Sequence, residues 1–153
     1  VDIRTVAGGV PLKVPVFTAG LGSTRVAADQ WEGLAIGAAL AGSIQVIGEN
    51  VCGMDPKAEF DDGGKVVESP ELRRRVETYR RFWDGTHGDI VVQTNVEDQR
   101  FGVDIYALQV LGVKTIERKW GQGAKAIGGE VRIDDLDRAL MLKRRGYIVR
   151  PDR

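Results

Sequence analysis

The sequence predicts an α/β fold of the (β/α)8 TIM barrel type, with this chain supplying roughly the first half, four to five βα units. Short β-rich runs alternate with longer segments of helical period, which is typical of parallel strands joined by helical crossovers. Polar residues follow each of the first four expected strands, and this even spread favours a barrel rim over the single switch point of an open sheet. A whole barrel needs about 250 residues, whereas the chain has 153.

The first expected elements are a strand over 14–19, a helix over 28–41 and a second strand over 43–47. The strands are indicated by β-branched and apolar runs, and the helix by the period of its apolar residues. The helical residues spaced to share one buried face are Trp31, Leu34, Ala35, Ala38 and Ala39.

Residues 50–68 interrupt this alternation and are expected to form an inserted loop. They are rich in glycine and proline and include an Asp-Asp-Gly-Gly run at 61–64. Ser69-Pro70 then predicts an N-cap and a first helical position, for a helix that extends to about Trp83.

The alternation continues to the end of the sequence. The remaining expected elements are a strand over 89–94, a helix over 104–111, a strand over 113–118, a helix over 134–145 and a strand over 147–149. Gly112 and Gly146 are the expected stops of the two helices. Residues 1–153 are therefore expected to form one partial barrel domain.

Composition narrows the classes of function. Basic and acidic side chains number 22 each, so there is no global field to attract nucleic acid or an anionic membrane. The single cysteine, Cys52, excludes an internal disulfide and a thiolate cluster, and with no histidine near it in sequence it predicts packing more than catalysis. Apolar runs are shorter than the ~20 residues of a membrane span. We expect a cytoplasmic protein with no nucleic-acid or membrane partner.

Four clusters at strand ends are the candidates for a site. They are Gly20-Leu21-Gly22-Ser23, Gly48-Glu49-Asn50, Gln93-Thr94-Asn95 and the stretch from Lys119 to Lys125. In a barrel, the carboxyl ends of parallel strands form one rim, where such enzymes place their chemistry. We therefore expect these groups to face a common ligand.

Other motifs are weaker. Arg25 occupies the place of the third glycine in a dinucleotide fingerprint, and residues 121–125 lack the spacing and terminal Ser or Thr of a P-loop. The arginine run at 73–75 interleaves with Glu71 and Glu77 at helical spacing, which predicts a salt-bridged solvent face and not a nucleic-acid surface.

Four segments match the pattern of a known family in order. They are Pro15-Val-Phe-Thr-Ala-Gly-Leu-Gly-Ser23, Gly48-Glu49, Val91-Val-Gln93 with Arg100-Phe-Gly102, and Lys119-Trp-Gly-Gln-Gly-Ala-Lys125. Over most of its length the chain resembles the FMN-binding synthase domain of glutamate synthase and its stand-alone, archaeal-type relatives. The resemblance implies a (β/α)8 barrel that holds FMN and reduces 2-iminoglutarate, formed from 2-oxoglutarate and ammonia, to glutamate.

The resemblance also implies roles for individual residues. Lys119 would stabilise negative charge along N1 and the C2 carbonyl of a reduced flavin, and Gln93 would pair with the pyrimidine edge. Lys125 would hold a substrate carboxylate, and Glu49 would orient or protonate the imine nitrogen. The other expected cofactor-binding residues are Gly20, Leu21, Gly22, Ser23 and Gln122.

The sequence departs from the family in three ways. Ala126-Ile127 replaces the usual Pro-Gly after Lys125, and Leu21 replaces a methionine, so the amine and the 2-oxo acid stay open. The cysteine-rich segment is absent, and an iron–sulfur cluster would have to come from parts outside this chain. The second half of the barrel, which grips the flavin phosphate in many such barrels, would also come from elsewhere, so we expect an oligomer or a partner subunit.

Two other interpretations remain open. The chain could be a non-catalytic half-barrel, as a fragment or an assembly subunit, whose glycine-rich rim packs against a partner. It could also be another FMN-dependent barrel oxidoreductase, such as one of the N-methylglutamate synthase type. A flavin absorption spectrum would distinguish the FMN-binding enzyme from the non-catalytic half-barrel.

Overall fold

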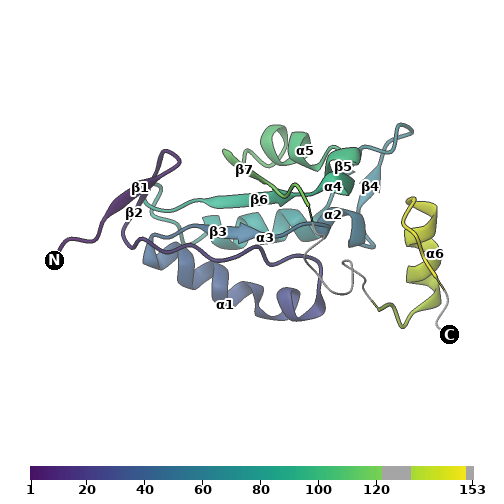
Figure 1. The fold of residues 1–153 in the computed structure, drawn as a ribbon, viewed down its shortest axis with the longest axis horizontal. Coiled ribbons are helices and arrows are strands. Elements are labelled where there is room, and N and C mark those ends of the chain that lie inside the picture. Colours follow the sequence, from purple (N-terminus) through teal and green to yellow (C-terminus); the bar gives the residue numbers. More distant parts are fainter. Residues whose placement is uncertain (122–131, 151–153) are drawn as a thin grey trace.

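The protein is a mixed α/β fold built on a parallel sheet, and the computed structural model describes residues 1–121 and 132–150. Three strands form the sheet in the order β3 (Gln45–Ile47), β6 (Ile90–Thr94) and β7 (Thr115–Arg118). The central strand β6 pairs in parallel with both β3 and β7, so the three strands lie in the sheet in the order in which they occur in the sequence (Figure 1). The parallel α/β fold predicted from the sequence is thus present.

The first expected strand, over 14–19, does not form a regular strand. Its neighbourhood is joined to β3 by two isolated parallel bridges, Phe17 to Ile44 and Leu21 to Ile47. Proline lacks the N–H that a ladder needs and glycine weakens a strand; Pro15 lies within the segment and Gly20 directly follows it, which explains the interrupted pairing. It still runs along the edge of the sheet next to β3.

Helices α1 (Arg25–Ala41) and α3 (Pro70–Arg80) form in the two regions where the sequence predicts helices. Residue Thr24 caps α1 by accepting a hydrogen bond from a backbone N–H, so the helix starts three residues before the predicted position 28. The predicted Ser69 cap and Pro70 first position of α3 are confirmed, but α3 ends before Trp83. Leu34, which was expected on the buried face of α1, is 40% exposed because it lies at the edge of that face.

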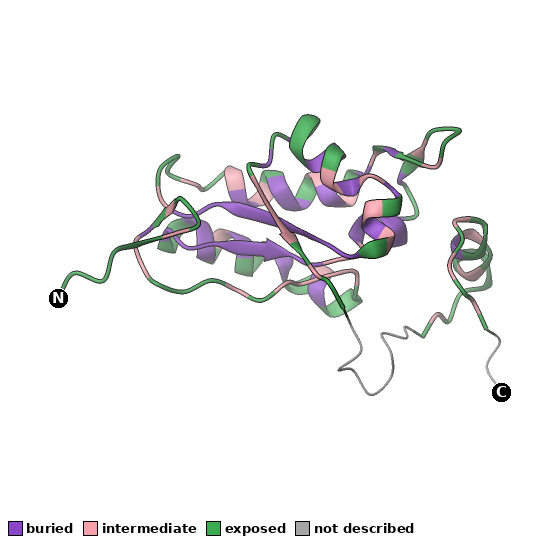
Figure 2. Cartoon of the chain, turned by 45° about the horizontal axis from the view of Figure 1, so that its top comes forward, coloured by how far each residue is buried: buried purple, intermediate pink, exposed green. Residues whose placement is uncertain are grey.

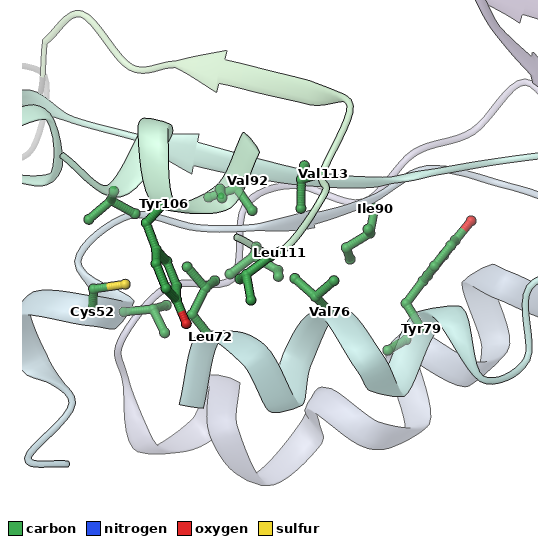
Figure 3. Packing of buried hydrophobic residues seen from close by; sticks show 14 of the residues in the cluster. Cys52, Leu72, Val76, Tyr79, Ile90, Val92, Tyr106, Leu111 and Val113 are labelled. Carbon is green, nitrogen blue, oxygen red and sulfur yellow. The ribbon is translucent and has the colours of Figure 1, made fainter. Parts of the chain in front are cut away.

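The main hydrophobic core lies between the sheet and its helices. Figure 3 shows Leu72, Val76 and Tyr79 of α3 directed toward Ile90 and Val92 of β6. Residues of α1 and of α5 (Val103–Gln109) belong to the same buried cluster. All three helices therefore cover one face of the sheet, and Figure 2 shows how the buried positions concentrate along β3 and β6.

An unpredicted β-hairpin covers part of the opposite face. It consists of β1 (Thr5–Ala7) and β2 (Val10–Leu12), joined by two glycines with φ of 57° and 85°. Gly-Gly between apolar runs is a recognised hairpin signal, because both positions of such a turn need positive φ. The hairpin lies at the amino ends of the strands (Figure 1) and contributes to a second buried cluster, whose members are Leu12, Ile44, Val46 and Val91.

The insertion at 50–68, expected as a loop, contains regular structure. A short helix, α2 (Val51–Met54), is followed by a hairpin of β4 (Glu59–Phe60) and β5 (Val66–Glu68). These elements are too short for their apolar pattern to be recognised in the sequence. They lie at the carboxyl ends of the parallel strands, beside α4 (Val96–Arg100), a second short helix that was not predicted (Figure 1).

The expected fifth strand at 147–149 is absent. After α6 (Leu136–Arg144), the Arg145 guanidinium donates hydrogen bonds to the carbonyl oxygens of Gly53 and Asp55, at 2.9 and 2.7 Å. Tyr147 packs against Phe101. These contacts hold the segment against the insertion and away from the sheet, which explains the missing strand.

Candidate functional site

Polar side chains gather at the carboxyl ends of the sheet, on the face turned away from the helices. Along β6, Val92 belongs to the helix-facing core, so the alternation of a strand directs Val91 and Gln93 to the other face. Gln93 is the register partner of Glu117 on β7. Two residues beyond Glu117, Lys119 continues the same edge, and its backbone N–H donates to the carbonyl oxygen of Thr94 at 2.9 Å.

The Gln93 amide is held between two segments. Its Nε2 donates a hydrogen bond to Oε1 of Glu117. Its amide lies against Gly20, where an added Cβ would come within 2.9 Å of Nε2 and 3.0 Å of Oε1. A larger residue at position 20 would therefore have to displace the Gln93 amide.

Glu49 and Lys119, two of the predicted site residues, lie in direct contact. Lys119 Nζ lies 2.8 Å from Oε1 of Glu49, across 70 residues of sequence. The lysine side chain is 26% exposed and the glutamate side chain 11%, so the pair is largely shielded. Its distance and partial burial make it a charge-assisted bond that connects the end of β3 with the end of β7.

Close backbone contacts explain why glycine occurs at position 22 of the turn and at position 48 beside it. A Cβ on Gly48 would lie 2.5 Å from the nitrogen of Gly22, and a Cβ on Gly22 would lie 2.7 Å from the carbonyl oxygen of Glu49. Leu21 packs against the main core. Here the glycines allow two chain segments to pass each other, which is a structural role that the sequence did not distinguish from ligand contact.

Arg75 stabilises the same turn from outside and corrects a prediction. The arginines of α3 were expected on a solvent face, but the Arg75 side chain is only 1% exposed. It donates to the carbonyl oxygens of Leu21 and Gly22 at 2.9 Å each and pairs with Glu71 at 2.8 Å. Arg74 does follow the prediction, since it forms an exposed ion pair with Glu71.

Ser23 is directed elsewhere. It lines a hollow of about 480 Å³ between the start of α1, α2 and α3, together with Asp55 and Arg75. Among the described residues, the lining of this hollow includes none of Glu49, Gln93 and Lys119. Ser23 and Leu21 are thus the described members of the predicted set whose side chains lie apart from the polar cluster.

A buried carboxylate ties the loops after β3 and β6 together. Asp98 of α4 accepts hydrogen bonds from the backbone nitrogens of Asn50, at 2.9 Å, and Asn95, at 3.2 Å. Burial raises the pKa of Asp98 to about 6, although these hydrogen bonds lower it and the negative charge of Glu49 adds to the rise. No role was predicted for Asp98 from the sequence, where the Asn-x-x-Asp spacing of a capping box was the available signal.

Glu117 is a further residue for which the sequence predicted no role. Glu117 lies on β7 and Lys119 just beyond its last residue, Arg118, so their two-residue spacing was the available signal that both face the same way. Lys125 and Gln122, predicted to contact substrate and cofactor, lie outside the described residues. Burial raises the pKa of the Cys52 thiol to about 12, so this thiol stays protonated and packs in the core.

Within residues 1–121 and 132–150, no group of three or more His, Cys, Asp or Glu side chains is arranged to hold a metal ion. No helix in this described part combines the length and apolar character needed to cross a bilayer. Comparisons with protein-family models, curated proteins and solved structures find no match to this chain. The chemistry of the site therefore has to be argued from its own residues.

Proposed function

We propose that this chain is the first half of a (β/α)8 barrel that binds FMN and reduces a 2-imino acid, in the manner of glutamate synthase. The observation that carries the proposal is the convergence of Gly20, Glu49, Gln93 and Lys119 in one polar cluster. They come from the carboxyl ends of β3, β6 and β7 and from the segment that runs beside β3, as expected for a barrel rim. The sequential order of the parallel strands, with the helices on one face, supports the same architecture.

The residues of the cluster fit a flavin. An ammonium group such as that of Lys119 stabilises negative charge, and a planar amide such as that of Gln93 pairs with the edge of a pyrimidine ring. The side chain of Gln93 is 8% exposed and has a carbonyl oxygen without a hydrogen-bond partner among the described residues. A buried acceptor in this state is suited to a ligand that brings an N–H group.

Each residue of the site would have a separate role in the reaction. When bound in its reduced form, FMN would supply the hydride, and an electron donor from outside this chain would reduce the flavin again. Lys119 stabilises the charge on the cofactor side, while Glu49, paired with it at 2.8 Å, can orient or protonate an imine nitrogen. Lys125 remains the candidate for the substrate carboxylate, so the substrate would be 2-iminoglutarate or a related 2-imino acid.

A titration tests the proposal. FMN added to the chain should show saturable fluorescence quenching at one FMN per chain, and Lys119→Met should weaken binding at least about tenfold through the loss of a charge-assisted contact. Lys114→Met is the matched control, because Lys114 lies at the opposite end of β7, exposed near Trp83. Binding that is equal in all three proteins would remove Lys119 from the site.

One observation favours a second candidate, a non-catalytic half-barrel that packs on a partner. Val16 and Phe17, on the outer edge of the sheet, are 60% and 61% exposed. Exposed apolar residues on an unpaired edge favour association. A chain that takes up no FMN and loses its self-association on Phe17→Lys, measured by light scattering, would support this second function.

A further inference from the structure

The contact between Gln93 and Glu117 determines which atom of the amide faces the site. A carboxylate only accepts hydrogen bonds, so the amide atom beside Glu117 must be the NH2 group. This conclusion depends on the chemistry of the pair, and an interchange of N and O in the amide would leave two acceptors facing each other. The carbonyl oxygen Oε1 is therefore the amide atom that does not contact Glu117.

That oxygen is one of five buried side-chain polar atoms without a hydrogen-bond partner among the described residues; the others are both amide atoms of Gln45, Oγ1 of Thr94 and the hydroxyl of Tyr147. Oε1 of Gln93 is buried and has no hydrogen-bond partner among the described residues. Gly20 lies against the amide, at 3.0 Å from an added Cβ to Oε1, so there is little room for the side chain to turn toward another partner. A buried carbonyl without a donor is costly, and such groups are generally completed by water or a ligand.

We propose that Glu117 is a positioning residue that holds the Gln93 amide with its carbonyl oxygen toward the ligand, so that the site selects a ligand edge that donates an N–H. This inference rests on the proposed function. For a flavin, the edge is the N3–H of the pyrimidine ring, which lies between two carbonyl groups. The opposite orientation of the amide would instead favour a ligand carbonyl.

Glu117→Gln separates this role from simple packing. A glutamine at 117 has nearly the same size, but it can donate as well as accept, so the Gln93 amide is free to adopt either orientation. Glu97→Gln is the matched control, because Glu97 lies on α4, 41% exposed, and pairs with Arg100. Both variants remove one negative charge.

The first measurement needs no ligand. With glutamine side-chain amides labelled with 15N, one Gln93 amide proton should appear far downfield in the wild-type chain and in Glu97→Gln, and should move back in Glu117→Gln. A Gln93 amide that is indifferent to Glu117→Gln would overturn the inference, whatever the chain binds.

The second measurement uses 15N-labelled FMN at saturation. The N3–H proton should exchange with water at least about tenfold more slowly in the wild-type complex than in the Glu117→Gln complex, since a satisfied buried hydrogen bond is worth about that factor. Bound FMN with a rapidly exchanging N3–H in the wild-type complex would reject the inference and leave the proposed function standing. No FMN binding at all would reject both, even if the first measurement succeeds. Should Glu117→Gln fail to fold, the wild-type exchange rate, compared with that of free FMN, decides.

Discussion

The two ends of the same strands, on the same face of the sheet, differ in chemistry. At the amino end, Ile44 and Val91 pack under Leu12 of the hairpin in a closed apolar cluster. At the carboxyl end, two residues farther along β6, Gln93 is bound to a glutamate and lies near an ion pair. Val91 is 4% exposed and Gln93 is 8% exposed, so burial is nearly equal while polarity is opposite.

Packing alone does not require this difference. An apolar residue at position 93 would continue the amino-end cluster, whereas a buried carbonyl without a donor costs about 1–3 kcal/mol. Local departures from the rules that stabilise a fold tend to occur at functional sites. The amino end is thus the part that stabilises the sheet, and under the proposed function the carboxyl end is the part that gives up stability for recognition.

The largest expected effect on stability comes from a substitution in the apolar cluster at the amino end. Leu12→Ala removes a side chain that is 2% exposed from the small cluster, and should lower the free energy of unfolding by about 2–5 kcal/mol. The measurement is urea unfolding followed by circular dichroism. The control, Val6→Ala, alters a residue of the same hairpin that is 65% exposed, and should cost no more than about 0.5 kcal/mol. Equal losses in the two variants would mean that the hairpin is not packed on the sheet.

An intermediate effect concerns pH and belongs to the carboxyl end. The pKa of Asp98 is about 6 in the folded protein against 3.8 for the free side chain, so between these values the folded state binds more protons. Stability from this group is full below about pH 4 and falls as pH rises through 6, by roughly 3 kcal/mol in all. The difference in unfolding free energy between wild type and Asp98→Asn should follow this curve. Parallel pH profiles for the two proteins would contradict it.

The sequence was most informative where local signals agree with tertiary packing. Ser69-Pro70 began α3 as predicted, and Trp31 and Ala35 are buried as their spacing indicates. In both cases a short-range rule and the core require the same residue. Glu49 and Lys119 were expected at one rim because each follows a predicted parallel strand, and they do lie together, but no local rule predicts their ion pair across 70 residues.

It was least informative where structure depends on contacts distant in sequence. The burial of Arg75 follows from carbonyl oxygens more than 50 residues away, at Leu21 and Gly22. Tyr147 belongs to an apparent strand in the sequence, but Arg145 binds the insertion and holds it elsewhere. Neither contact leaves a periodic pattern, so local reasoning could not find them.

The smallest effect on stability should accompany a large effect on binding. Gln93→Met keeps the length of the side chain and removes the carbonyl without a donor, so the free energy of unfolding should change by no more than about 1 kcal/mol, while FMN affinity falls about tenfold or more. Thermal unfolding and flavin fluorescence measure the two quantities on the same samples. Gln109→Met, at the exposed end of α5, should change neither. A large loss of stability in Gln93→Met with unchanged binding would mean that the carboxyl end serves the fold as the amino end does, and the contrast between the two ends would then carry no functional meaning.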